Sequence, residues 1–265
     1  MMSNKITEAG NPAEQINQGE NTLIPFDASI VFSEEMQRQA RHLMETIVDY
    51  KELMMMYTCA MKEVQTKFDI LNTEFKVRYR RNPIAAITTR LKTTASITEK
   101  LARYNCSLSV ENVEKYIHDV GGVRVICSYI DDIYLIADAL LAQDDITLLR
   151  KKDYIAEPKP NGYRSLHLIV TVPVFFADHR LDMKVEVQIR TIAMDYWASL
   201  EHQMKYKRDI PDQEQISEEL RLCAETIRQT DERMLAIRQK IEAAEDIMDE
   251  DDLLFEKLSR IDIGL

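Results

Sequence analysis

Residues 159–167 read Lys159-Pro160-Asn161-Gly162-Tyr163-Arg164-Ser165-Leu166-His167, and the rest of the chain can be interpreted outward from them. Asn161-Gly162 predicts a turn, because both residue types tolerate a positive φ. The branched and apolar residues after the turn predict a strand through Val172 that Pro173 ends. The turn is therefore expected to deliver Tyr163 and Arg164 to the end of a strand.

Glycine is scarce in the long interior of the chain. Between Gly19 and Gly264 only Gly121, Gly122 and Gly162 occur, and they lie in two places that each begin a predicted strand. Glycine permits backbone conformations and close approaches that other residues do not. These two places are where we expect a ligand.

Length and composition indicate one main domain. The chain has 265 residues, of which 45% are hydrophobic and 30% charged, an ordinary mixture for a soluble protein. No apolar run approaches the roughly 20 residues that span a bilayer, and the N-terminus has no apolar signal core, so we expect a cytoplasmic protein. The cysteines have no paired spacing, which favours reduced packing residues over disulfides or a zinc site; they are Cys59, Cys106, Cys127 and Cys223.

Charge is unevenly distributed along the chain. The formal net charge is -11, but residues 76–103 contain eight basic side chains against one acid, Glu99, a local net charge of +7. The basic residues are Lys76, Arg78, Arg80, Arg81, Arg90, Lys92, Lys100 and Arg103. Such a patch on an acidic protein suggests an anionic ligand such as a polyphosphate, and a solvated basic helix face is the equal alternative.

Hydrophobic periodicity predicts long helices near both ends and alternating strands and helices between them. Helices are predicted over 36–75 (as one helix or two), 83–104, 109–118, 131–141, 191–207 and from 216 to at least 241, and strands over 123–127, 146–152, 164–172 and 183–190. Residues 1–28 are predicted to be a disordered tail and 245–252 a frayed acidic end. This order favours an α/β (α+β) fold built on a sheet over a helical bundle.

Two carboxylates are candidates for a magnesium site. Asp119 precedes the glycine pair, and Glu186 lies with Gln188 on the polar face of the alternating strand 183–190. Neighbouring strands could bring both acids to one Mg²⁺, which proteins hold through one or two carboxylates together with substrate phosphates. A helix cap at Asp119 and a solvent-facing Glu186 are the alternatives. His118-Asp119 lacks the other ligands of a metal-dependent phosphohydrolase, and no glycine-rich phosphate loop occurs.

Three linked motifs resemble the synthetase domain of RelA/SpoT proteins. They are His118-Asp119-Val120-Gly121-Gly122-Val123-Arg124-Val125-Ile126-Cys127, then Asp153-Tyr154-Ile155 with the 159–167 stretch, and then Val185-Glu186-Val187-Gln188-Ile189-Arg190-Thr191 with Trp197 and Glu201-His202. Their order and spacing are family-like over about residues 82–207. Without a hydrolase domain before them or regulatory domains after them, the chain is most similar to the small alarmone synthetases, single-domain bacterial makers of ppGpp and pppGpp.

The resemblance implies a nucleotidyltransferase-like fold, with a mixed β-sheet, flanking helices and helical extensions at both ends. The implied activity is that of a GTP diphosphokinase of the stringent response, which transfers pyrophosphate from ATP to the 3′-hydroxyl of GDP or GTP and releases AMP. We expect a disordered tail (1–28), a helical region (29–81), the synthetase domain (82–210), and an amphipathic helix with an acidic end (211–265).

The resemblance also implies the site residues. Those for ATP are Arg90 and Arg124, which would sandwich the adenine, and Lys92, Ser96, Lys100 and Arg103, which would hold phosphates. Those for GDP or GTP are Tyr163, which would stack on guanine, and Lys159, Asn161, His167 and Gln188. Asp119 would bind Mg²⁺, and Glu186 would share the metal or deprotonate the attacking hydroxyl. In one form of the family motif a Gly precedes the arginine, whereas this chain has Thr89 before Arg90. This departure bears on the backbone geometry expected just before Arg90.

One further hypothesis rests on chemistry alone. Asp195, in the helix after the strand of Glu186, could accept hydrogen bonds from N1–H and N2–H of guanine. The alternative is a surface helix residue.

Relatives suggest a homo-oligomer, a tetramer, in which the apolar seam 216–241 packs on its own domain or on another subunit. Further ligands to consider are (p)ppGpp as an allosteric effector and single-stranded RNA, and no membrane is expected. Two other functions stay open: a catalytically silent nucleotide or RNA binder on the same fold, and a nucleotidyltransferase with a different acceptor.

Overall fold

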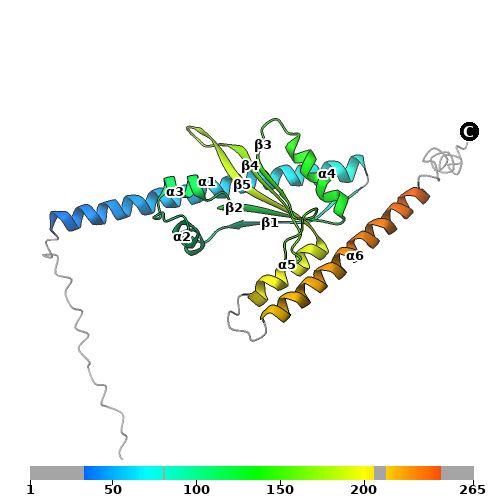
Figure 1. The fold of residues 1–265 in the computed structure, drawn as a ribbon. Coiled ribbons are helices and arrows are strands. Elements are labelled where there is room, and N and C mark those ends of the chain that lie inside the picture. The colour runs from blue at the N-terminus through cyan, green and yellow to red at the C-terminus, as the bar shows by residue number, and fades with distance from the viewer. Residues whose placement is uncertain (1–32, 80, 206–212, 246–265) are drawn as a thin grey trace, which may run out of the picture. The chain divides into compact units, whose positions relative to one another are not determined.

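The computed structural model describes residues 33–79, 81–205 and 213–245 (Figure 1). The predicted tail 1–28 and the acidic stretch 246–252 lie outside these ranges. The described residues divide into two units, with the boundary between Leu43 and Met44. Within the described ranges, no helix is both long enough and apolar enough to cross a bilayer.

Helix α1 (Glu34–Arg78) is continuous over 45 residues, so the first predicted stripe forms one helix and not two. Within the second unit its buried side chains recur at steps of three and four and include Leu53, Tyr57, Val64 and Phe68. This spacing places them on one face, which packs into the core.

The sheet has five strands in the order β1-β2-β5-β4-β3. The strands are β1 (Ile84–Leu91), β2 (Gly121–Cys127), β3 (Thr147–Asp153), β4 (Leu166–Phe175) and β5 (Arg180–Thr191). Only β2 and β5 pair in parallel, and the other neighbours are antiparallel. The mixed sheet with flanking helices confirms the predicted fold class.

The predicted helix over 83–104 is wrong in its first half. Residues 84–91 form the edge strand β1, which pairs with β2, and helix α2 (Thr94–Ala102) follows. Branched residues fit a pleated strand better than a helix, and pairing with β2 supplies the ladder hydrogen bonds. The Thr93 side chain then caps α2 by accepting from the amide of Ser96. Side chains at 88 and 90 consequently share a face at a spacing of two.

The prediction that Pro173 ends its strand is also wrong, because β4 continues to Phe175. Strand β3 pairs with β4 only as far as Thr171. Beyond that residue β4 is an edge on one side, which is where a sheet tolerates proline.

One face of the sheet is apolar and buried. Val123, Val125, Leu168, Val170, Val185 and Val187 are at most 1% exposed. They share a single core with buried residues of α1 and of α4 (Ile130–Leu141). Because side chains alternate along a strand, the polar residues between them point to the opposite face.

Helices α5 (Ile192–Lys205) and α6 (Gln213–Glu245) pack on each other around Trp197 and Ala224, and α3 (Val110–Tyr116) completes the helices. Thr191 caps α5 as predicted, because its hydroxyl accepts from the amide of Met194, and it also donates to Asp231 of α6. The predicted seam of α6 is correct only in part. The packed face runs through Leu220, Ala224, Ile227, Asp231 and Arg238, whereas Cys223, Met234, Ile237 and Ile241 are exposed. In the C-terminal half of α6, polar contacts such as that of Arg238 with Asp131 determine which side of the helix packs against the domain.

Candidate nucleotide site

The strand register aligns candidate residues in two rows across the polar face of the sheet. The first row is Arg90, Gly122, Glu186, Ile169 and Arg150, and the second is Thr88, Arg124, Gln188, His167 and Lys152. Each row contains residues from all five strands, although these are far apart in the sequence. Gly122 leaves the space between Arg90 and Glu186 open, since an added Cβ would meet only backbone oxygens, at 3.5 and 3.9 Å.

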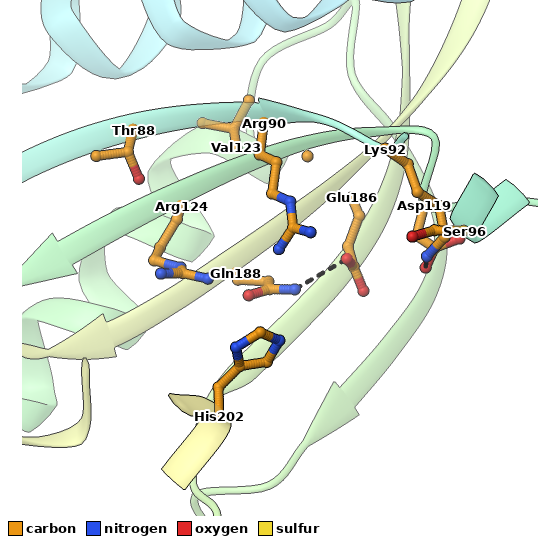
Figure 2. Close-up of a pocket in the computed structure, with 11 residues that line it drawn as sticks. Thr88, Arg90, Lys92, Ser96, Asp119, Val123, Arg124, Glu186, Gln188 and His202 are labelled. Carbon is orange, nitrogen blue, oxygen red and sulfur yellow. Dashed lines mark hydrogen bonds and ion pairs between the residues drawn. The ribbon is translucent and has the colours of Figure 1, made fainter. Parts of the chain in front are cut away.

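A cavity of about 470 Å³ opens on the β1–β2–β5 part of this face (Figure 2). Its lining includes the predicted ATP residues Arg90, Lys92, Ser96 and Arg124, together with Asp119, Glu186 and Gln188. Figure 2 shows Arg90, Arg124 and Gln188 projecting into it from the strands, with His202 of α5 facing them. Several cations thus surround a space large enough for part of a nucleotide.

A second cavity, of about 280 Å³, lies on the β3–β4 side. It is strongly basic, and its lining includes Lys100, Arg150, Lys152, Lys159 and His167. Asp119 and Glu186 line this cavity as well as the first one. The two predicted metal ligands therefore stand where the two cavities meet.

Asp119 is held between two lysines. Lys92 donates to one of its carboxylate oxygens and Lys100 to the other, each over 2.8 Å. Burial opposes ionisation of Asp119, but these hydrogen bonds and the positive charges outweigh it and hold its pKa below the usual value. Asp119 is therefore an anion at neutral pH, and its two oxygens are already paired with cations that are also suited to phosphates.

Glu186 is the end of a hydrogen-bonded chain. His167 Nδ1 lies 3.2 Å from Glu186 Oε1, and Gln188 donates to Oε2 over 2.9 Å. Burial raises the pKa of Glu186, yet the contacts with His167 and Gln188 outweigh it and leave the pKa below its usual value. Glu186 is thus ionised and oriented, as a base or a metal ligand requires.

The hydroxyl of Tyr163 links this chain to Arg190. It lies 2.8 Å from His167 Nε2 and accepts from Arg190 Nη2 over 2.5 Å. Since arginine can only donate, the hydroxyl proton is available for His167 Nε2, which leaves the Nδ1 proton to face Glu186. The predicted guanine platform and the predicted base are therefore joined by two successive side-chain contacts.

The turn before Tyr163 forms as predicted. Gly162 has φ +86°, and Asn161 accepts from the amide of Tyr163 over 3.3 Å. Asn161 also donates to Glu201 of α5 over 2.9 Å. Lys159 Nζ lies 4.6 Å from the centre of the Tyr163 ring, within the range of a cation–π contact. The turn is thus tied to α5 through Asn161, and Lys159 of the same loop lies over the Tyr163 ring.

Asp195 lies in the first turn of α5. Its Oδ1 is 3.2 Å from Arg190 Nη1 and 3.3 Å from Arg124 Nη1. Asp195 is therefore an ion-pair partner of two arginines of the site.

Most of the predicted site residues converge, with three differences in position. Arg103 lines neither cavity and pairs with Glu99 on the exposed side of α2. Lys100, expected at ATP phosphates, lines the second cavity, whereas Gln188, expected at the acceptor, lines the first. Tyr163, Asn161 and Asp195 adjoin the cavities through the contacts described above and do not line them.

Five further residues that line the cavities or contact their lining have no predicted role: Arg190, Arg150, Lys152, Thr88 and His202. Arg190 alternates with Glu186 and Gln188 along one predicted strand, and Arg150 alternates with Lys152 along another. The sequence pattern could therefore have placed these three residues on the polar face of the sheet. Thr88 was hidden by the incorrect helix over 83–104. His202 belongs to the third family motif, but its place in the lining of the larger cavity follows only from the packing of α5.

Asp119 and Glu186 alone do not supply enough ligands to hold a metal ion. Among the residues that the structure describes, no group of three or more His, Cys, Asp or Glu side chains could hold a metal ion. Asp119 and Glu186 nevertheless both line the same two cavities. A pair of carboxylates that needs phosphate oxygens to complete its coordination is the usual arrangement for Mg²⁺.

Comparison with known proteins agrees with this geometry. A family described as "Region found in RelA / SpoT proteins" matches residues 89–211. The GTP pyrophosphokinase YwaC of Bacillus subtilis is 42% identical over 196 residues, which cover 73% of this chain and 92% of that protein. The GTP pyrophosphokinase YjbM of the same organism is 34% identical, over 74% of this chain and 92% of that protein.

Solved structures give the same result. The small alarmone synthetase 2 of B. subtilis matches with a TM-score of 0.64 and 43% identity, over 71% of this chain and 97% of that chain. The small alarmone synthetase 1 of B. subtilis bound to its product pppGpp matches with a TM-score of 0.66 and 33% identity, over 73% of this chain and 98% of that chain. The chain therefore belongs to the RelA/SpoT family, among its small alarmone synthetases.

Proposed function

We propose that the chain transfers pyrophosphate from ATP to the 3′-hydroxyl of GDP or GTP, with release of AMP and formation of ppGpp or pppGpp. The observation that carries this proposal is the position of Asp119 and Glu186, which line both cavities. A group that passes from one nucleotide to another must cross such a junction. The names of the relatives, both GTP pyrophosphokinases, support the same reaction.

ATP occupies the larger cavity in this proposal. Arg90 and Arg124 flank its base, and Lys92 and Ser96 meet its phosphates at the start of α2. Both Lys92 and Lys100 can exchange Asp119 for phosphate oxygens when the nucleotide binds. Several cations aimed at one polyphosphate lower the barrier mainly by charge stabilisation and alignment.

GDP or GTP occupies the smaller cavity, with its base toward Tyr163. Lys159 and His167 are suited to its phosphates, and Arg150 and Lys152 add positive charge from the β3 edge of the same cavity. Such a concentration of cations fits a di- or triphosphate better than a neutral acceptor.

Glu186 is assigned the role of general base. It takes the proton of the acceptor 3′-hydroxyl while that oxygen bonds to the β-phosphorus of ATP, and the bond from this phosphorus to the oxygen of the α-phosphate breaks, so AMP leaves. The carboxylate is unprotonated at neutral pH and can therefore accept this proton, and its contacts with His167 and Gln188 orient it. Mg²⁺ would be held by Asp119 and Glu186 and would supply charge neutralisation to the phosphates.

We also propose residues 82–210 as the synthetase domain, a cytoplasmic location and a homotetramer. The family match over 89–211 supports the domain, and the exposed apolar residues Met234, Ile237 and Ile241 of α6 support association. Light scattering of a chain truncated at Pro211 tests the last point, since an unchanged oligomer would contradict a role of α6 in assembly.

The reaction itself is tested with purified protein, labelled ATP, GDP and Mg²⁺. Release of AMP with formation of ppGpp is the expected result, and Glu186→Gln should abolish it. A silent nucleotide or RNA binder would yield no AMP. Another nucleotidyltransferase would yield a different product, which chromatography identifies.

A further inference from the structure

Asp195 connects two arginines that serve different parts of the site. Arg124 lines the larger cavity, proposed for ATP. Arg190 supports the proposed guanine platform, because it donates to the Tyr163 hydroxyl and its guanidinium carbon lies 5.1 Å from the centre of the Tyr163 ring. Both contacts with Asp195 use the same oxygen, Oδ1.

The three charges depend on one another. Burial lowers the pKa of Arg124, the neighbouring charge of Arg190 lowers it further, and Asp195 opposes both effects. Arg190 is only 4% exposed, so water screens its charge poorly. Asp195 therefore pairs with both arginines and offsets part of the repulsion between them.

A shared acceptor atom makes the two contacts competitive. At 3.2 and 3.3 Å both ion pairs are longer than the 2.7–2.9 Å typical of a charged N–H···O pair, as expected if neither is optimal. When bound ATP attracts Arg124, Oδ1 can approach Arg190 more closely. Arg190 in turn holds the Tyr163 hydroxyl and accordingly the orientation of the ring.

We propose that Asp195 is a positioning residue that couples the two nucleotide sites, so that ATP binding strengthens the binding of the acceptor. The inference rests on the proposed function for the assignment of the two cavities. It differs from the hypothesis that Asp195 reads guanine directly, because a direct contact changes acceptor affinity equally with and without ATP. Coupling instead changes the ratio of the two affinities.

The test is titration calorimetry of the full chain with GDP and Mg²⁺, with and without saturating α,β-methylene ATP. For the unaltered protein we expect GDP to bind about fivefold or more tightly when the analogue is present, a typical coupling. Asp195→Ala should reduce this ratio to less than about twofold. Asp195→Asn retains a neutral acceptor for the arginines and should restore part of it. By thermodynamic reciprocity, saturating GDP must raise the affinity for the ATP analogue by the same factor.

Asp178→Asn is the matched control, because Asp178 is an exposed carboxylate outside both cavities, and it should leave the ratio unchanged. Circular dichroism of each variant checks folding. The inference is overturned if the unaltered protein shows a ratio of one, or if Asp195→Ala retains the full ratio. A separate AMP-release assay on the unaltered protein distinguishes these results from failure of the proposed function, which would give no AMP at all.

Discussion

Replacement of Tyr163 tests the acceptor site directly. Tyr163→Ala removes the ring proposed to stack on guanine, and base–aromatic stacking contributes about 1–3 kcal/mol in single-strand binders. Because about 1.4 kcal/mol corresponds to a factor of ten, KM for GDP and GTP should rise by about 5- to 150-fold. KM for ATP should change much less, since Tyr163 does not line the larger cavity. Initial rates measured with each substrate varied in turn give both constants.

Tyr163→Phe is the matched control for this experiment. It keeps the ring and removes only the hydroxyl, which contacts Arg190 over 2.5 Å and His167 over 2.8 Å. A hydrogen bond to a charged group is worth about 1.5–3 kcal/mol, so kcat should fall by about 10- to 150-fold through the loss of His167 and Glu186 orientation. KM for the acceptor should stay within about threefold of its original value, because the stacking ring remains.

Two outcomes would refute this reasoning. Unchanged KM for both GDP and GTP in the folded Ala variant would exclude Tyr163 as the guanine platform. An equal loss in the Phe and Ala variants, confined to KM, would show that the hydroxyl and not the ring binds the acceptor.

Three further predictions concern the turn and Asp119. Gly162→Ala forces φ +86° on a residue with a Cβ and brings that atom to 2.5 Å from Ala224 Cβ, so urea unfolding should show a loss of about 2–4 kcal/mol, whereas Gly122→Ala should cost less than about 1 kcal/mol. Because the pKa of Asp119 is lowered in the folded protein, its ion pairs stabilise the fold above the usual carboxylate pKa and are lost as pH falls through the folded value. Asp119→Asn should therefore flatten the decline of the unfolding free energy below about pH 4, and a decline identical to that of the unaltered protein would contradict this. Lys100→Ala leaves Asp119 less neutralised, so Mn²⁺ without nucleotide, measured by electron paramagnetic resonance, should bind about fivefold more tightly; unchanged binding would mean that Lys100 does not compete with the metal.

Local sequence pattern was sufficient where the pattern itself fixes the conformation. The pair Asn161-Gly162 forms the predicted turn, in which Gly162 has the positive φ. The alternation of residues 183–190 predicted strand β5 and its polar face with Glu186 and Gln188. The motifs around Asp119, Tyr163 and Glu186 indicated the family, which the comparisons confirm. The individual roles of these residues stay predictions that the experiments above address.

Long-range pairing decided what the pattern left ambiguous. The spacing of polar and apolar residues over 84–91 fits a helix stripe, although the branched residues favour a strand, and the ladder with β2 selects the strand. The packed face of α6 likewise follows from Asp231 and Arg238, whose partners Thr191 and Asp131 lie far away in the sequence. Periodicity reports only which residues of one segment share a face, so it could not reveal either partner.

The sequence by itself determined the inventory of the site: the turn, the platform residue, the carboxylates and most of the cations. The tertiary structure alone decided which of them meet, because the register of five strands places Arg90, Gly122, Glu186 and Arg150 in one row. It also joined Arg124, Asp195, Arg190 and Tyr163 into one network. Local propensities set the conformation of each segment, whereas the contacts between segments depend on pairing and packing energies summed over the whole core.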